Sequence, residues 1–128
     1  MPVSAVLANL VRCIHVGVLA FILLTPFVAT RALQLVIYLL FIFAIVMHWI
    51  AHHHFCILSL IESKLRGIDY EDGFINAILK PIFGFGVSHR AAYAVVAVLS
   101  LVALARLVRM ARRLRAELLR AELLRVPS

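Results

Sequence analysis

Six side chains that can bind metal ions or transfer protons stand close together in the stretch HWIAHHHFCILSLIE, which runs from His48 to Glu62. His48 and His52 are four residues apart, so on a helix both imidazoles could hold one metal ion from the same face. Cys56 follows one turn later as a soft ligand. Together with His15 on an earlier apolar segment, this stretch could serve a small membrane protein that binds metal or haem, or a membrane enzyme.

The alternative is a structural polar core. On a helix that advances about 100° per residue, most of the polar side chains between His48 and Glu62 fall within an arc of roughly 120°. Polar groups without partners are costly at membrane depth, so we expect this face to point into a helix bundle. The interpretation assigns no metal and no cofactor, and its core consists of His15, His48, Trp49, Cys56, Ser59 and Glu62.

Within this core we expect His15 and His48 to meet across two neighbouring helices. A neutral imidazole donates with one ring nitrogen and accepts with the other, so the two rings can satisfy each other, with Trp49 stacked on them. On a continuous helix Cys56 would lie roughly 12 Å from His48, too far to share a metal ion with it. Replacing either histidine by Ala should then lower thermal stability without loss of bound metal.

Signatures of other catalytic sites are missing from the sequence. It contains no nucleophile elbow and no Gly-rich phosphate loop, and the GFG at residues 84–86 is typical of a turn. Glu62 is better placed to pair with Arg66, four residues later on a helix, than to act as a general base. We therefore assign no catalytic residue and leave open whether the protein is an enzyme.

Three long apolar segments must position these side chains. Residues 13–29 and 33–50 carry no charge, and each would extend roughly 25 Å as a helix, close to the ~30 Å hydrocarbon core of a bilayer. The third, residues 91–108, follows Ser88, a residue type that caps helix N-termini. Only three residues separate the first two, which predicts a tight antiparallel hairpin. The predicted transmembrane helices lie near residues 10–29, 33–56 and 89–109.

The segment between the second and third spans should lie at the membrane interface. ESKLRG is typical of a helix end, with Gly67 as a left-handed cap. Asp69 or Asp72 could start a further short helix that Pro81 stops, and aromatic rings favour headgroup depth. The residues assigned to this interfacial segment are Tyr70, Gly73, Phe74 and Pro81.

The positive charge belongs to the C-terminal tail. The net charge is +7, and residues 106–128 carry seven Arg against two Glu, so we expect no nucleic-acid partner. The third helix should continue out of the membrane as a solvated or headgroup-lying helix. We divide the chain into a transmembrane bundle, 1–109, and a basic amphipathic extension, 110–128. The residues expected to bind anionic lipid or a partner subunit are Arg106, Arg109, Arg112, Arg113 and Arg115.

Composition and charge distribution together set the predicted class and orientation. A hydrophobic content of 65% with 15% charged residues excludes an ordinary soluble domain. We predict an all-α integral membrane protein with three transmembrane helices, short interfacial helices and a long basic C-terminal helix. With three crossings, eight Lys and Arg would flank one side and five the other, which places the C-terminus in the cytoplasm or inside.

The order of these motifs resembles a bacterial family of small polytopic membrane proteins of unknown function, and similar short proteins of large algal DNA viruses. Members have a His in the first helix, a Trp before Cys-Pro-Leu-Thr-x-x-Glu, and Tyr-x-x-Gly-Phe-Ile before a Pro. The resemblance covers roughly residues 7–105 and implies a compact multi-helix membrane fold with a polar cluster inside, but no reaction. Here Ile57 replaces the Pro and Ser59 the Thr. The matching positions are His15, Trp49, Cys56, Glu62, Gly73, Phe74 and Pro81.

The function expected from the sequence is that of a non-enzymatic multi-pass membrane protein, a structural or assembly subunit of a membrane complex or virion membrane. Its partners would be the lipid bilayer and, through the Arg tail, other membrane subunits or anionic lipid. The alternative is a membrane metal- or haem-binding protein or enzyme. That alternative would use His15, His48, His52, Cys56 and Glu62.

Overall fold

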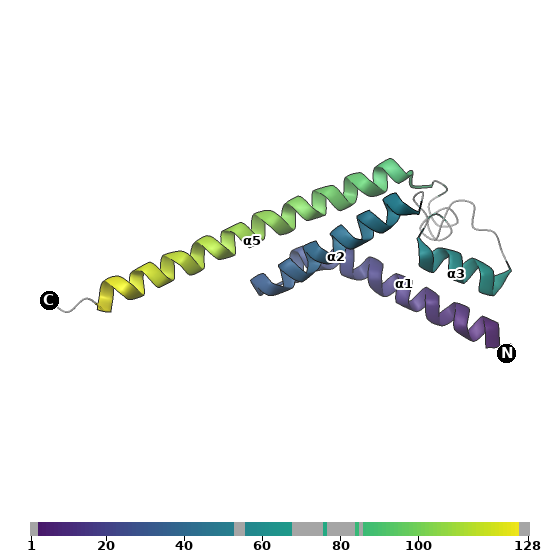
Figure 1. The fold of residues 1–128 in the computed structure, drawn as a ribbon, viewed down its shortest axis with the longest axis horizontal. Helices are drawn as coiled ribbons and strands as arrows, with labels where there is room; N and C mark the ends of the chain where they lie inside the picture. Colours follow the sequence, from purple (N-terminus) through teal and green to yellow (C-terminus); the bar gives the residue numbers. More distant parts are fainter. Residues whose placement is uncertain (1–2, 53–55, 68–75, 77–83, 85, 126–128) are drawn as a thin grey trace.

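Three helices of this protein are long and apolar enough to cross a membrane: α1 (Val3–Val28), α2 (Ala32–Ala51) and α5 (His89–Arg125) (Figure 1). The computed structural model describes residues 3–52, 56–67, 76, 84 and 86–125, and in this part of the chain the fold is all-helical. The three predicted apolar helices are thus confirmed, and they indicate a membrane-embedded protein. α1 begins seven residues earlier than predicted.

The turn between α1 and α2 is short and closed by hydrogen bonds. The backbone N–H groups of Thr30 and Arg31 both donate to Oε1 of Gln34, at 2.9 and 3.0 Å. These bonds satisfy backbone donors that the start of a helix leaves without a partner inside the helix. The predicted hairpin is present, and α2 runs back from the turn (Figure 1).

Pro26 lies inside α1 and does not end it. A proline has no N–H to donate to the carbonyl four residues before it, which here belongs to Ile22. That carbonyl oxygen accepts a hydrogen bond from the Tyr38 hydroxyl of α2 at 3.1 Å. A side chain of the neighbouring helix therefore replaces the missing backbone donor, as proline in a membrane helix requires.

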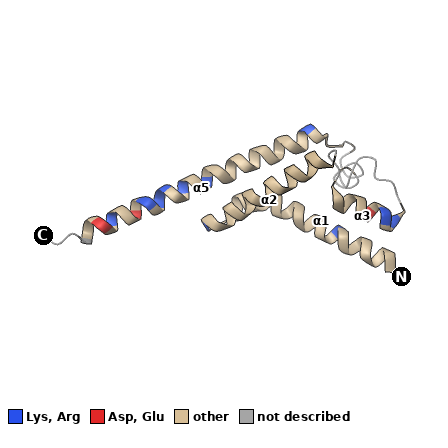
Figure 2. Cartoon of the chain, in the orientation of Figure 1, with Lys and Arg blue, Asp and Glu red and all other residues tan. Residues whose placement is uncertain are grey.

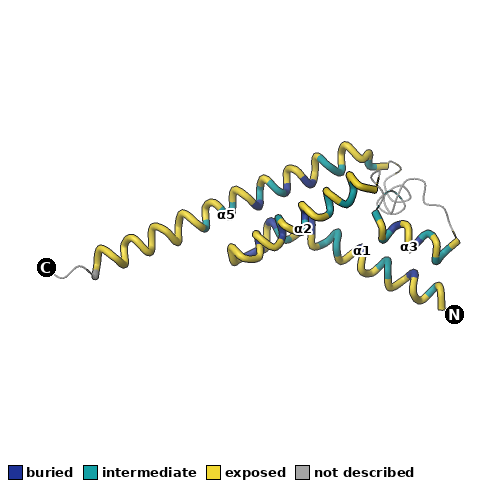
Figure 3. Tube along the Cα trace, viewed as in Figure 1, coloured by how far each residue is buried: buried dark blue, intermediate teal, exposed yellow. Residues whose placement is uncertain are grey.

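The apolar core lies between α1, α2 and α5. Leu35 and Tyr38 of α2 and Ala103 of α5 are fully buried in it. The core residues of α2 and of α5 both recur at three- and four-residue spacing, which places them on one face of each helix. Most other large apolar side chains of these helices are exposed, as lipid-facing residues would be (Figure 3). The remaining core residues are Ile22, Ala29, Ile42, Val96 and Leu99.

The second helix ends earlier than predicted. α2 stops at Ala51, and a separate helix, α3 (Ile57–Arg66), starts after Cys56, whose backbone is extended (φ −83°, ψ 128°). The prediction of one helix over 33–56 was therefore wrong, and so was the continuous polar face drawn on it. The end of α3 is as predicted, because Gly67 adopts the left-handed conformation (φ 65°).

Helix α5 is a single, uninterrupted helix from His89 to Arg125. The Ser88 hydroxyl accepts a hydrogen bond from the N–H of Ala91 at 3.2 Å, which confirms the predicted cap. No Gly or Pro occurs within the helix, so nothing in its sequence would bend it. Its C-terminal part extends well past the α1–α2 turn and carries most of its charged residues (Figure 2).

Candidate functional site

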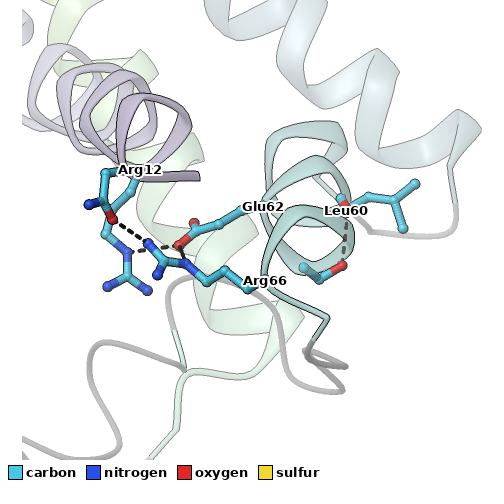
Figure 4. A network of polar contacts seen from close by, with 6 residues as sticks. Arg12, Leu60, Glu62 and Arg66 are labelled. Atoms are coloured by element: carbon cyan, nitrogen blue, oxygen red, sulfur yellow. Dashed lines mark hydrogen bonds and ion pairs between the residues drawn. The ribbon is translucent and has the colours of Figure 1, made fainter. Parts of the chain in front are cut away.

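A buried carboxylate joins α1 to α3. Glu62 is 0% exposed, and its Oε1 accepts hydrogen bonds from Nε of Arg12 at 2.8 Å and from Nε of Arg66 at 2.9 Å (Figure 4). The pairing with Arg66 confirms the sequence prediction. Arg12 was not predicted as a partner, because it lies 50 residues away in the chain.

A second contact extends this network along α1. Nη2 of Arg66 donates to Oδ1 of Asn9 at 2.8 Å. Asn9 and Arg12 are three residues apart and share a face of α1, while Glu62 and Arg66 are four apart on α3. Two residues from each helix thus form one network, which we call the Glu62 network. A buried carboxylate is tolerated when charge-assisted hydrogen bonds compensate for the lost water.

His15 continues this interface by one turn of α1. Its ring is largely buried, and its Nε2 lies 3.6 Å from Sγ of Cys56. The expected pairing of His15 with His48 is therefore not the contact that the structure contains. Because α2 ends at Ala51 and Cys56 precedes a separate helix, the thiol lies beside the histidine that we had expected to pair with His48.

His48 instead holds the start of α3. Its Nε2 accepts a hydrogen bond from the backbone N–H of Ile57 at 3.3 Å. The Cys56 side chain makes no such capping bond. The His48 ring also lies 4.5 Å, centroid to centroid, from the ring of His52. An imidazole from the preceding helix therefore takes the role that Ser, Thr, Asp or Asn usually has at a helix start.

The other two members of the predicted polar core lie in different places. Ser59 is buried on α3. Trp49 packs edge-on against Tyr93 of α5, with ring centroids 5.4 Å apart and ring planes at 88°. Trp49 thus contributes to the contact between α2 and α5, whereas we had expected it to stack on histidine.

Arg106 anchors α5 to the end of α1. Its guanidinium donates to the carbonyl oxygen of Pro26 through Nη1 and to that of Ala29 through Nη2, the latter at 2.7 Å. The last carbonyls of a helix have no partner within it and carry partial negative charge, so a cation is favourable there. We had predicted lipid or partner binding for Arg106, and the prediction did not include this contact of its guanidinium with the end of α1.

The remaining tail arginines are exposed. Arg112, Arg113 and Arg115 project from the part of α5 beyond the hairpin, and Arg109 makes only a long contact, at 3.4 Å, with the carbonyl of Ala105 in its own helix. The interfacial residues Tyr70, Gly73, Phe74 and Pro81 lie outside the described residues.

Chemically, the described polar residues are arranged to hold helices together. In the described ranges no three His, Cys, Asp or Glu side chains converge closely enough to hold a metal ion. Among the described residues, Cys56 and His15 pair a potential nucleophile with a potential base, at 3.6 Å. No family model, no curated protein and no solved structure matches this chain.

Proposed function

We propose that this protein is a non-enzymatic multi-pass membrane subunit that builds or stabilises a membrane complex or a virion membrane. The observation that carries the proposal is the closed pairing of Glu62 with Arg12 and Arg66 between α1 and α3. The three charged side chains of this network hold α1 and α3 in a fixed arrangement. Such an arrangement favours a scaffold over a site that must admit a substrate.

The lipid-facing surface supports the same proposal. Large apolar side chains stand outward on every long helix, among them Phe43 of α2 at 66% exposure and Leu101 of α5 at 65%. Lipid tails are as apolar as these residues, so the same faces can contact either lipid or another membrane helix. The exposed part of α5 beyond Arg106 offers a further docking element.

Native electrophoresis after extraction in a mild detergent tests the proposal. We expect the chain to migrate in a discrete complex larger than its own detergent-bound monomer. The substitution Leu101→Trp, on the exposed face of α5, should disturb that complex without unfolding the chain. A chain that is monomeric under every mild extraction condition would contradict the assembly role.

The metal or haem alternative keeps one specific observation in its favour, the short distance between Cys56 and His15. Elemental analysis and an absorption spectrum of the purified protein decide it. Stoichiometric metal or haem that is lost in His15→Ala would replace our proposal with this alternative. Purified protein without either, and with His15→Ala affecting only stability, would support the scaffold role.

We further propose that the C-terminus lies on the inner, cytoplasmic side and the connection between α3 and α5 on the other. The eight-to-five distribution of Lys and Arg supports this orientation. Cysteines introduced at Asp72 and at Arg113 should react with a membrane-impermeant thiol reagent from opposite sides of the membrane. Labelling of the unaltered chain, which contains Cys13 and Cys56, gives the background. Reaction of both from the same side would contradict three crossings.

A further inference from the structure

We propose that Arg109, Arg112, Arg113 and Arg115 form an arginine collar that binds the headgroups of anionic phospholipids where α5 leaves the membrane. The inference rests on the proposed role as a membrane subunit and adds the chemical class of one partner. It rests on two observations: Arg106 binds the end of α1 and so fixes where α5 leaves the bundle, and four exposed Arg follow it in the sequence.

The contact of Arg106 with α1 fixes where the apolar bundle ends on this side. The guanidinium holds the carbonyls of Pro26 and Ala29, at the α1–α2 turn. From His89 to Arg106 a helix rises roughly 26 Å, close to the ~30 Å thickness of the hydrocarbon core. α5 therefore crosses the core with the residues before Arg106 and emerges just after it.

The collar begins at headgroup depth. Arg109 lies roughly 5 Å beyond Arg106 along the helix axis and Arg115 roughly 14 Å, while the headgroup layer is about 5–8 Å thick on each side. A tilt of the helix shortens this distance along the membrane normal. Long Arg side chains also reach back toward the interface from the more distant positions.

The collar itself contains no acidic residue. Between Arg106 and Arg115 the sequence contains no acidic residue, and the acids of α5, Glu117 and Glu122, both come later. Arg31, at the start of α2, is exposed at the same end of the bundle and adds to the positive field. Figure 2 shows this run of Arg along α5 past the turn.

The collar also faces away from the bundle. Leu107 and Met110 pack on the apolar core. At about 100° per residue, the four collar arginines occupy roughly 160° of the remaining helix circumference. They are therefore directed toward the surrounding headgroups, not toward α1 and α2.

The positive charge of the collar favours an anionic phospholipid over a second copy of the chain as its binding partner. A second copy of the chain, inserted in the same direction, would place two acid-free arginine runs side by side, and like charges repel. Phospholipid phosphate accepts two parallel hydrogen bonds from one guanidinium. Each Arg near an anionic bilayer surface contributes about fivefold in association.

The test measures which lipid the purified full-length chain retains. The protein is reconstituted in an equimolar mixture of zwitterionic phosphatidylcholine and anionic phosphatidylglycerol, extracted mildly, and its bound lipids are quantified by mass spectrometry. We expect enrichment of phosphatidylglycerol, and we expect it to be lost in the fourfold variant Arg109→Gln, Arg112→Gln, Arg113→Gln, Arg115→Gln, because four factors of about fivefold multiply to several hundredfold in association. Raising the ionic strength before extraction should lower the enrichment of the native chain, because exposed charges are screened.

A matched pair of single substitutions sharpens the test. Arg115→Gln removes a collar charge, whereas Arg120→Gln removes the same charge from between Glu117 and Glu122. We expect the first to lower phosphatidylglycerol retention several-fold more than the second. Circular dichroism checks that both variants stay helical.

Two results would contradict the proposal that the collar binds anionic lipid. One is that the chain retains phosphatidylglycerol no better than phosphatidylcholine, and the other is that Arg115→Gln and Arg120→Gln lose phosphatidylglycerol retention equally. Neither outcome touches the proposed subunit role, which is judged from the size of the native complex. Conversely, a monomeric chain that still retains phosphatidylglycerol through the collar would overturn the subunit role alone.

Discussion

The two halves of α1 are held by different kinds of contact. Toward α3, α1 presents Asn9, Arg12 and His15, which meet charged or polar partners. Toward α2 and α5 it presents Ile22 and its neighbours, which join an apolar core. One helix thus has a charged interface near its N-terminal half and an apolar interface near its C-terminal half.

The difference shows where specificity comes from when lipid is the solvent. Apolar surfaces gain little by meeting each other in a bilayer, because the lipid is equally apolar. The apolar interface is accordingly fixed by hydrogen bonds at its end, from Tyr38 and Arg106 to carbonyls of α1. The α1–α3 interface is fixed by paired charges. We expect the charged interface to be the more sensitive of the two to single substitutions.

The largest effect should come from Glu62. Replacing it with Gln leaves the Arg12 and Arg66 guanidinium groups next to each other without a carboxylate. Because the Arg12 and Arg66 side chains are 42% and 23% exposed, solvent screens both pairs, and we expect the loss of the two charge-assisted hydrogen bonds to cost about 2–4 kcal/mol. The free energy of unfolding in detergent, measured by denaturant titration, should fall by this amount, while Glu117→Gln on the exposed part of α5 should leave it unchanged. Equal stabilities of the two variants would remove the distinction between the two interfaces.

Arg106 is the corresponding test of the apolar interface. Arg106→Gln shortens the side chain and leaves the carbonyls of Pro26 and Ala29 without their donor, which costs about 1–3 kcal/mol. Arg109→Gln, one turn later, removes the same charge but no contact with α1 and should be nearly neutral. Thermal unfolding in detergent measures both. If the two substitutions had the same effect, the anchoring role of Arg106 would be wrong.

His48→Ala removes the acceptor for the N–H of Ile57 at the start of α3. Loss of a helix cap costs about 1 kcal/mol, so the unfolding temperature should fall modestly and without release of metal. His52→Ala keeps the cap and should have a smaller effect. A loss of bound metal in His48→Ala would instead assign this histidine to a metal site.

The smallest effect is expected for Tyr38→Phe, which keeps the ring and deletes the hydrogen bond to the Ile22 carbonyl. Such bonds between membrane helices average about 0.6 kcal/mol. Pro26→Ala supplies a backbone N–H to the same carbonyl, so in that background Tyr38→Phe should cost less. A double-mutant cycle measures this coupling, and strict additivity would show that the hydroxyl does not compensate for the proline.

The features that follow from local sequence were predictable. Uninterrupted apolar runs gave the three long helices, Ser88 and Gly67 marked a start and an end, and spacing alone paired Glu62 with Arg66. Each of these depends on residues within a few positions of one another. Local chemistry determines such features before any tertiary contact forms.

The contacts that were missed all depend on the break between α2 and α3. Residues 52–56 contain neither Gly nor Pro, so the helical pattern of α2 appeared to continue. Without the break, neither the contact of His15 with Cys56 nor the cap from His48 could be deduced.

The tail showed a different limitation. Its arginines looked equivalent in the sequence, yet Arg106 is engaged inside the protein and the four that follow are exposed. A single Arg near the end of the eighteen-residue, otherwise uncharged stretch 91–108 is a signal for such an anchor only once the end of another helix is known to lie beside it. Composition could not supply that position.

The Arg106 contact also has a consequence for how the chain is made. The carbonyl of Ala29 is synthesised 77 residues before the guanidinium that binds it. When α1 and α2 enter the membrane, the C-terminal end of α1 still lacks this partner, and it gains one only when α5 is in place. In a chain that ends before Arg106, the carbonyls at the end of α1 would therefore lack the donor that α5 provides. We expect membrane quality control to recognise this exposed helix end.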